Sequence, residues 1–156
     1  MAEDPREYPS RPLVGVGGLI VDENGRVLLV KRAFDPGKGL WAVPGGTPEV
    51  GETLKEALVR EVEEETGVKI QVEKLIDVFD LIVNDEKGKV RYHFVLVDFL
   101  AKPLTGEVRP SFETPEVRWV GLKELKNYPL TATTRRLINL ALEKGILKGG
   151  VNNVYG

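Results

Sequence analysis

The chain has 156 residues, a formal net charge of −2, 29% charged residues and no cysteine. This length predicts one domain with a substantial core, and the lack of cysteine excludes a disulfide framework, a structural thiolate zinc site and a thiol nucleophile. The chain has no overall excess of basic residues, so we expect no nucleic-acid partner. No apolar run is long enough to cross a membrane, so we expect no membrane partner. The polar start of the chain is unlike a signal sequence, and we therefore expect a cytoplasmic protein.

The first two strands follow a proline-rich start. Residues 1–12 contain three prolines and no hydrophobic periodicity, which predicts a flexible arm ahead of a single domain over residues 13–148. Leu13–Asp22 and Arg26–Arg32 predict two strands that pair across the turn residues between them. At the other end of the chain, residues 149–156 predict a flexible tail.

The second strand leads to two features that suit a phosphate ligand. It ends in Lys31 and Arg32, either of which could hold a phosphate or simply be solvated. After a loop, Trp41–Pro44 predicts a short strand that runs into Gly45 and Gly46. Adjacent glycines permit a close approach of the backbone to a phosphate, although an ordinary tight turn uses the same residues. We treat these two cations and two glycines as candidate substrate-binding residues.

The helix that follows is defined at both ends. Thr53 and Glu56 form a capping box at its start, and Gly67 is a natural left-handed stop. At about 100° per residue one face is apolar, formed by Leu54, Ala57, Leu58 and Val62. Glu61 and Glu65 lie within roughly 20° of the bearing of this stripe, so two carboxylates continue the buried face. The opposite face carries Lys55, Val59 and Glu63.

These inward-facing acids require a counter-charge. Carboxylates in the last turns of a helix are disfavoured by about 0.3–1 kcal/mol each, and burying one costs several kcal/mol unless it is compensated. Arg60 is the only cation in the second half of the helix, too little for Glu61, Glu64 and Glu65. A solvated acidic face is the alternative interpretation. The geometry favours a metal site instead, and all-oxygen ligands select a hard cation, Mg²⁺ or Mn²⁺.

The rest of the chain mixes strands and helices. Lys69–Val83 and Lys89–Leu100 predict long strands around a turn, and Glu116–Val120 predicts a short strand. Leu122–Leu125 predicts a brief helix and Thr133–Lys144 a second long one. Because Lys89–Leu100 is apolar on both faces, we expect a central strand covered on each side. Helices on both sides of a mixed β-sheet give an α/β/α sandwich.

The acidic helix and the loop before it resemble a known family. The matching positions are Gly46, Glu52, Arg60-Glu61-Val62, Glu64-Glu65 and Gly67-Val68. They reproduce the Nudix box, G-x5-E-x7-R-E-U-x-E-E-x-G-U with U aliphatic, at every specified position. The resemblance implies the Nudix α/β/α fold and hydrolysis of a nucleoside diphosphate linked to a further group, with Mg²⁺ or Mn²⁺ as cofactor.

The resemblance gives the motif residues expected roles. The metal-binding positions are Gly46, Glu61, Glu64 and Glu65. Two of these, Glu61 and Glu65, are four residues apart and reach one point from adjacent turns. Glu52 and Arg60 form a scaffold pair that holds the loop against the helix. Glu63, on the opposite bearing, should be dispensable.

The sequence leaves the general base open. Nudix enzymes differ in whether a glutamate of the motif or a carboxylate on a distant loop takes this role. Glu113 lies in a loop and is the preferred candidate; Glu116, which begins a strand, is the alternative, although its role could instead be simple packing or pairing. His93, the only histidine, lies on a predicted strand, where packing is favoured over catalysis.

Two classes of hydrolase substrate compete. The overall pattern resembles small microbial ADP-ribose or nucleotide-sugar pyrophosphatases, which release AMP, yet Val78–Asp85 lacks the proline that many ADP-ribose enzymes carry there. The alternative is a nucleoside triphosphate pyrophosphohydrolase that removes damaged nucleotides. A non-catalytic nucleotide- or RNA-binding module is a third interpretation, disfavoured by the intact motif. Family analogy alone suggests a homodimer, and the single methionine and glutamine fit a heat-adapted composition.

Overall fold

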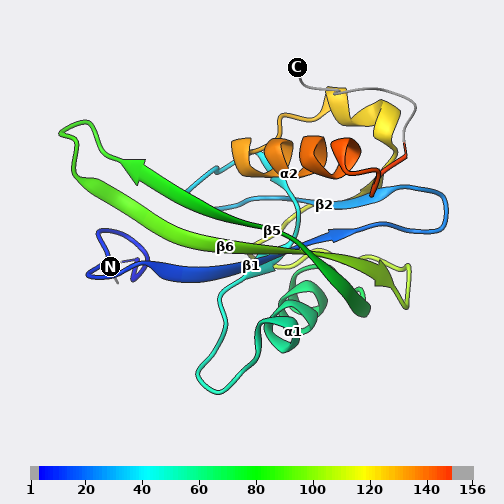
Figure 1. The fold of residues 1–156 in the computed structure, drawn as a ribbon, viewed down its shortest axis with the longest axis horizontal. Coiled ribbons are helices and arrows are strands. Elements are labelled where there is room, and N and C mark those ends of the chain that lie inside the picture. Colours follow the sequence, from blue (N-terminus) through cyan, green and yellow to red (C-terminus); the bar gives the residue numbers. More distant parts are fainter. Residues whose placement is uncertain (1–3, 149–156) are drawn as a thin grey trace.

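The structure, a computed structural model, describes residues 4–148, so the tail predicted over residues 149–156 lies outside the described residues. The elements in chain order (Figure 1) are β1 (Leu13–Ile20), β2 (Val27–Lys31), β3 (Trp41–Ala42), β4 (Gly45–Gly46), α1 (Leu54–Thr66), β5 (Ile70–Asn84), β6 (Val90–Pro103), β7 (Val117–Val120), the 3₁₀-helix η1 (Leu122–Asn127) and α2 (Ala132–Glu143). Within the described part, no helix is both long and apolar enough to cross a membrane.

The strands form two sheets between two helices. One sheet has the strand order β4-β1-β6-β5, in which β1 and β6 are parallel and the other neighbours antiparallel. The other is antiparallel, with the order β3-β2-β7. Figure 1 shows α1 and α2 on opposite sides of the strand layer. The predicted α/β/α sandwich with a mixed sheet is therefore confirmed.

The pairing predicted for the first two strands is wrong. β1 and β2 enter different sheets, and a single bridge between Val21 and Val27 joins them beside the turn. The turn itself forms as predicted, since the Asp22 carboxylate accepts the Arg26 N–H at 2.8 Å and Gly25 has a φ of 76°. Beyond the bridge the strands diverge because both edges of β1 are already paired, with β4 and β6.

Apolar side chains fill both sides of the four-stranded sheet. The cluster under α1 includes Ala57, Leu58, Val62, Val97 and Phe99. The cluster under α2 includes Leu19, Trp41, Leu137, Ile138 and Ala141. β6 lies between β1 and β5 and is buried on both faces over residues 97–99, as expected for a central strand. Each fully buried aliphatic side chain contributes about 1.5–3 kcal/mol, so these two clusters fix the helices on the sheet.

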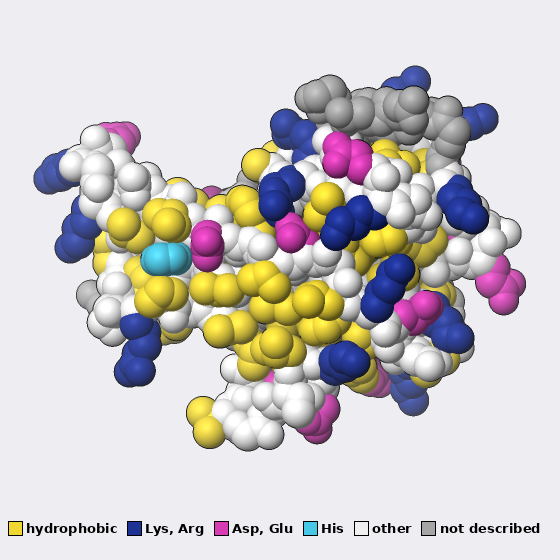
Figure 2. Space-filling model, in the orientation of Figure 1, with side chains coloured by type: hydrophobic (Ala, Val, Ile, Leu, Met, Phe, Trp, Pro, Cys, Tyr) yellow, Lys and Arg dark blue, Asp and Glu magenta, His cyan; other side chains and the backbone are white. Residues whose placement is uncertain are grey.

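The hairpin end of β5 and β6 leaves one sheet face open. On the edge strand β5, Leu75, Val78 and Ile82 are 53%, 52% and 53% exposed. Figure 2 shows this face, with apolar side chains running across the sheet above α1 and the histidine near the hairpin end. His93 stands opposite Ile82, far along β6 from the acidic helix, so its position fits packing and not catalysis.

The N-terminal segment, residues 4–12, is docked on this same hairpin. The Tyr8 N–H donates to the Arg91 carbonyl at 2.7 Å, and the Tyr8 hydroxyl donates to Asp85 at 3.0 Å. Arg91 Nε donates to the Glu7 carboxylate at 3.0 Å. Where the sequence predicts a loose arm, the structure therefore shows a segment with defined partners 77–84 residues away in the chain.

Candidate active site

The helix that carries the acids begins and ends as the sequence predicts. The Thr53 hydroxyl accepts the Glu56 N–H at 3.2 Å, and the Glu56 carboxylate accepts the Thr53 N–H at 3.1 Å. Gly67 ends the helix in the left-handed conformation, with a φ of 78°. The last turn of α1 contains no basic residue. No cation within the last turn of α1 therefore offsets the carboxylates at the C-terminal end of the helix.

Two of the acids face the protein, as the helical periodicity predicts. Glu65 is 8% exposed, and the Glu61 side chain is 14% exposed. The Glu64 side chain, by contrast, is 60% exposed. The structure thus separates two inward-facing carboxylates from a third that lies at the edge of the helix.

Arg60 makes the scaffold contact expected from the motif. Its Nε and Nη2 donate to the two carboxylate oxygens of Glu52 at 2.7 and 2.8 Å, and Nη2 also donates to the Thr47 carbonyl at 3.2 Å. The Arg60 hydrogen bonds, helped by the Glu49 N–H, lower the pKa of Glu52 to about 2. This bidentate contact holds the loop that precedes α1 against the helix.

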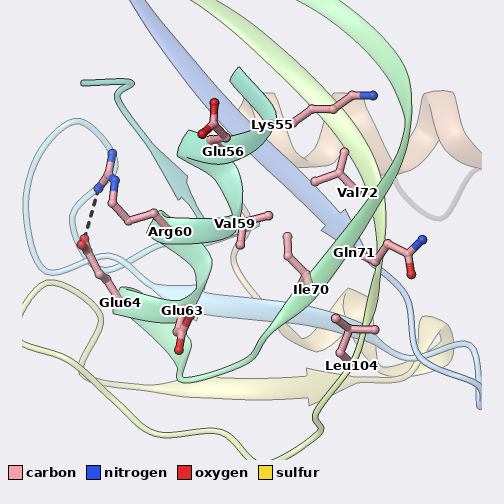
Figure 3. Close-up of a pocket in the computed structure, with 10 residues that line it drawn as sticks. All are labelled: Lys55, Glu56, Val59, Arg60, Glu63, Glu64, Ile70, Gln71, Val72 and Leu104. Carbon is pink, nitrogen blue, oxygen red and sulfur yellow. Dashed lines mark hydrogen bonds and ion pairs between the residues drawn. The ribbon is translucent and has the colours of Figure 1, made fainter. Parts of the chain in front are cut away.

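The same guanidinium also reaches two of the predicted metal ligands, which the sequence did not indicate. Arg60 Nη1 donates to Glu61 at 3.0 Å and to Glu64 at 3.3 Å, and Figure 3 shows Glu64 directed at Arg60. Across residues 4–148, no three acidic, histidine or cysteine side chains are grouped closely enough to hold a metal ion. The structure therefore brings together Glu61 and Glu65, while Arg60 binds both Glu61 and the exposed Glu64.

The two glycines of β4 lie directly against these acids. The Gly45 N–H donates to Glu65 Oε1 at 3.1 Å. A Cβ atom on Gly46 would lie 2.3 Å from the Glu61 carboxylate carbon, and one on Gly45 would lie 2.0 Å from the Val16 carbonyl oxygen. Neither position has room for a side chain. The close approach expected of these glycines is present, but it is made to the protein's own carboxylate and strand.

The electrostatics of the inward pair fit a hard divalent cation. Burial raises the pKa of Glu65 to about 8; the hydrogen bond from the Gly45 N–H lowers this pKa in part, and the charge of Glu61 raises it further. Burial also raises the pKa of Glu61, and the hydrogen bond from Arg60 lowers it in part. The fold therefore only partly stabilises the ionised form of these two carboxyl groups, and a bound cation would favour their ionisation. Their oxygen-only donors, with the adjacent Gly46 backbone, are the ligand type that Mg²⁺ and Mn²⁺ prefer.

Of the two cations at the end of β2, the structure directs one toward the acids. Lys31 forms an ion pair with Glu116 at 3.3 Å, and it therefore lies on the other side of the strand. Arg32 Nε donates to the Pro36 carbonyl at 2.6 Å. Burial lowers the pKa of Arg32, and the nearby charge of Glu65 partly restores it. Arg32 is thus the cation within electrostatic range of the buried carboxylates.

The structure also separates the two candidate bases. Glu116 is occupied by Lys31 and by Arg118, which contacts it at 3.0 Å. Burial is the main cause of the raised pKa of Glu61 and of Glu65, and the negative charge of Glu113 raises both pKa values further. Glu113, and not Glu116, is therefore the candidate base within electrostatic range of the inward acids.

A residue that sequence reasoning missed holds the Glu113 loop in place. Thr114 is 2% exposed, and its hydroxyl donates to the main-chain carbonyl of Glu65 at 2.7 Å. On the other side, the Ala33 N–H donates to the Glu113 carbonyl at 3.2 Å. The loop is therefore pinned to the last turn of α1 and to the segment after β2. A lone threonine in a loop carries no periodicity, so only its place next to Glu113 could have drawn attention to it.

A hollow of about 850 Å³ lies on the other side of α1 (Figure 3). Its lining includes Lys55, Val59, Ile70 and Leu104, and also Arg60 and Glu64 of the motif. Glu61 and Glu65 do not line it. The hollow therefore reaches the edge of the motif but not the inward acid pair, which defines the candidate site.

Comparison with known proteins agrees with this geometry. Residues 11–141 match the NUDIX domain. The chain is 37% identical over 114 residues to an ADP-ribose pyrophosphatase of Methanocaldococcus jannaschii, a match that covers 73% of this chain and 64% of that protein. It is 31% identical over 136 residues to the nucleoside triphosphatase NudI of Escherichia coli, covering 82% of this chain and 94% of that one.

A solved structure gives the same assignment. A NUDIX hydrolase from Nitrosomonas europaea superposes with a TM-score of 0.72 at 31% identity, covering 86% of this chain and 72% of that chain. With the domain match spanning most of the sequence and the full motif on α1, this chain belongs to the Nudix hydrolase family.

Proposed function

We propose that this protein hydrolyses the pyrophosphate bond of a nucleoside diphosphate joined to a further group. The preferred substrate is ADP-ribose or a nucleotide sugar, and the products are AMP or another nucleoside monophosphate and a sugar phosphate. The observation that carries the proposal is the pair of inward carboxylates, Glu61 and Glu65, within electrostatic range of Arg32 and Glu113. A diphosphate repels an attacking water through its own charge, so a site that cleaves it needs this combination of cations and acids.

The inward acids are proposed to bind the cofactor. Glu61 and Glu65, with the Gly46 carbonyl, would hold Mg²⁺ or Mn²⁺, which when bound neutralises charge on the phosphate oxygens. Glu64 would contribute from the edge of the helix. The Arg60 fork keeps this part of the helix and the preceding loop in register, because it contacts both.

The other residues are proposed to bind the phosphate and move the proton. Arg32 keeps guanidinium N–H groups beyond the one bonded to Pro36, and these can donate to a phosphate oxygen. Glu113 would accept the proton of the attacking water, since it is the loop carboxylate within electrostatic range of the acid pair. Lys31, which is paired with Glu116, has no part in this scheme.

Two substrates are supported by different relatives. The ADP-ribose assignment is supported by the M. jannaschii protein, of which the matched region of this chain spans 64%. The alternative, hydrolysis of a nucleoside triphosphate to a monophosphate and pyrophosphate, is supported by the E. coli protein named a nucleoside triphosphatase. A binding module without activity is disfavoured, because it would not need two buried acids beside a loop acid.

The test is product analysis with Mg²⁺ or Mn²⁺ across ADP-ribose, nucleotide sugars, dinucleoside polyphosphates and nucleoside triphosphates. AMP and ribose phosphate from ADP-ribose would support the first substrate. Pyrophosphate and a monophosphate from a triphosphate would support the second. Tight nucleotide binding without turnover of any of these compounds would leave the binding module as the function.

A further inference from the structure

The docked N-terminal segment places an arginine beside the proposed site. Arg6 Nε and Nη2 donate to the Asp4 carboxylate at 3.0 and 2.9 Å, and Nη2 also donates to the Asp35 carbonyl at 2.9 Å. The contacts of Glu7 and Tyr8 with Arg91 anchor the segment directly after Arg6. The guanidinium is thus held from both sides against the turn that follows β2.

Arg6 and Arg32 meet on this turn. Arg32 donates to the Pro36 carbonyl at 2.6 Å, and Arg6 donates to the preceding carbonyl, that of Asp35. The two guanidinium groups thus bind the same turn and lie within electrostatic range of each other. Burial is the main reason that the pKa of Arg32 is lowered, and the positive charge of Arg6 adds to the effect. Paired positive groups of this kind attract a ligand with several negative oxygens.

The arginine pair lies next to the acids of the site. The Ala33 N–H donates to the Glu113 carbonyl at 3.2 Å, which brings the Glu113 loop alongside the same turn. The pKa of Arg6, raised chiefly by Asp4, is raised further by Glu113. Because Glu113 also acts on Glu61 and Glu65, its carboxylate is within electrostatic range of both the arginines and the inward acids.

We infer that Arg6 is a substrate-binding residue that holds the diphosphate together with Arg32. A diphosphate presents negative oxygens on both phosphorus atoms, and two planar guanidinium groups can bind them with directed hydrogen bonds. Among residues 4–148, Arg6 Nη1 has no hydrogen-bond partner and is free to donate to the ligand. The inference rests on the proposed function, because it requires a diphosphate substrate. Arg6 lies outside the Nudix motif, so we assign it to affinity and not to bond cleavage.

The test compares two arginines of the same segment. Arg6→Ala is expected to weaken binding of inorganic pyrophosphate, measured by calorimetry with Mg²⁺, by about 10- to 100-fold, as for the loss of a charge-assisted hydrogen bond. It should raise KM for the hydrolysed substrate by a similar factor while kcat changes less than about threefold. Arg11→Ala removes the same charge from an exposed position and is expected to behave like the wild type.

A purely structural role gives different results. Arg91→Ala breaks the Glu7 ion pair that docks the segment but keeps Arg6. Because the docked segment positions Arg6, Arg91→Ala is expected to lose part of the same affinity. Wild-type pyrophosphate affinity in Arg6→Ala, or a fall in kcat with unchanged affinity, would overturn the inference. If Arg6→Ala does not fold, Arg6→Lys decides: weaker binding supports the role and unchanged binding overturns it. If the wild type binds pyrophosphate but hydrolyses none of the substrates, the proposed function fails while this comparison still decides the role of Arg6.

Discussion

Replacing Glu65 with glutamine removes a carboxylate whose ionisation opposes folding. Burial raises the pKa of Glu65 from its usual 4.5 to about 8. Below pH 4.5 Glu65 is protonated in both the folded and the unfolded chain, so its ionisation does not change the free energy of unfolding. Between pH 4.5 and about pH 8 Glu65 ionises in the unfolded chain but stays protonated in the folded chain, so the free energy of unfolding falls as the pH rises. Above about pH 8 this decrease in the free energy of unfolding is complete and amounts to roughly 4–5 kcal/mol.

In the presence of a chelator at about pH 9, Glu65→Gln is therefore expected to be more stable than the wild type by up to this amount. Its free energy of unfolding should also lose this part of the pH dependence. Glu63→Gln is the matched control, because it changes a glutamate on the opposite face of the same helix and should alter stability by less than about 0.5 kcal/mol.

The assay is urea unfolding of the three proteins from about pH 5 to pH 9, with chelator and then with Mg²⁺. Mg²⁺ should stabilise the wild type and have little effect on Glu65→Gln, because a ligand stabilises only the state that binds it. The reasoning is refuted if Glu65→Gln is the less stable protein at the highest pH in chelator, or if Mg²⁺ stabilises both proteins equally.

Three further outcomes test the site and the fold. In a steady-state assay with saturating Mg²⁺, Glu65→Gln should lose most activity and Glu63→Gln should keep most of it; equal losses would contradict the assignment of helix faces. Glu113→Gln should lower kcat by about 10²- to 10⁴-fold, while Glu116→Gln should keep the wild-type kcat; if the Glu113 variant also keeps the wild-type kcat, a glutamate of α1 is the base. Tyr92→Phe removes a buried hydroxyl that has no hydrogen-bond partner in the described part of the chain, so denaturant unfolding should show a change of less than about 1 kcal/mol; a loss above about 2 kcal/mol would reveal a partner for that hydroxyl.

The acidic helix could be predicted from the sequence because its determinants are local. The capping box of Thr53 and Glu56 and the stop at Gly67 each depend on neighbours within four residues. The burial of Glu61 and Glu65 follows from helical periodicity, which the structure confirms. Short-range geometry of this kind is set by the backbone and leaves little choice to the rest of the fold.

Contacts between distant segments could not be read in the same way. The turn after β1 is correct, yet β1 pairs with β6, some 80 residues further along the chain, because pairing depends on which strand edges remain free. The bond from the Thr114 hydroxyl to the Glu65 carbonyl joins residues 49 positions apart and depends on side-chain directions fixed only in the folded protein. The docking of Tyr8 on Arg91 likewise has no signal in a proline-rich segment.

The fit of β4 against α1 has a consequence for how this protein can evolve. Because Gly45 and Gly46 leave no room for a side chain, the corner that would cleave the bond tolerates almost no substitution. The N-terminal segment and the turn after β2 lie outside this close contact and are joined to each other by the hydrogen bond from Arg6 to the Asp35 carbonyl, so their other residues can vary more freely. Changes there could exchange one nucleotide substrate for another without disturbing the chemistry, so selection can act on recognition and on cleavage separately.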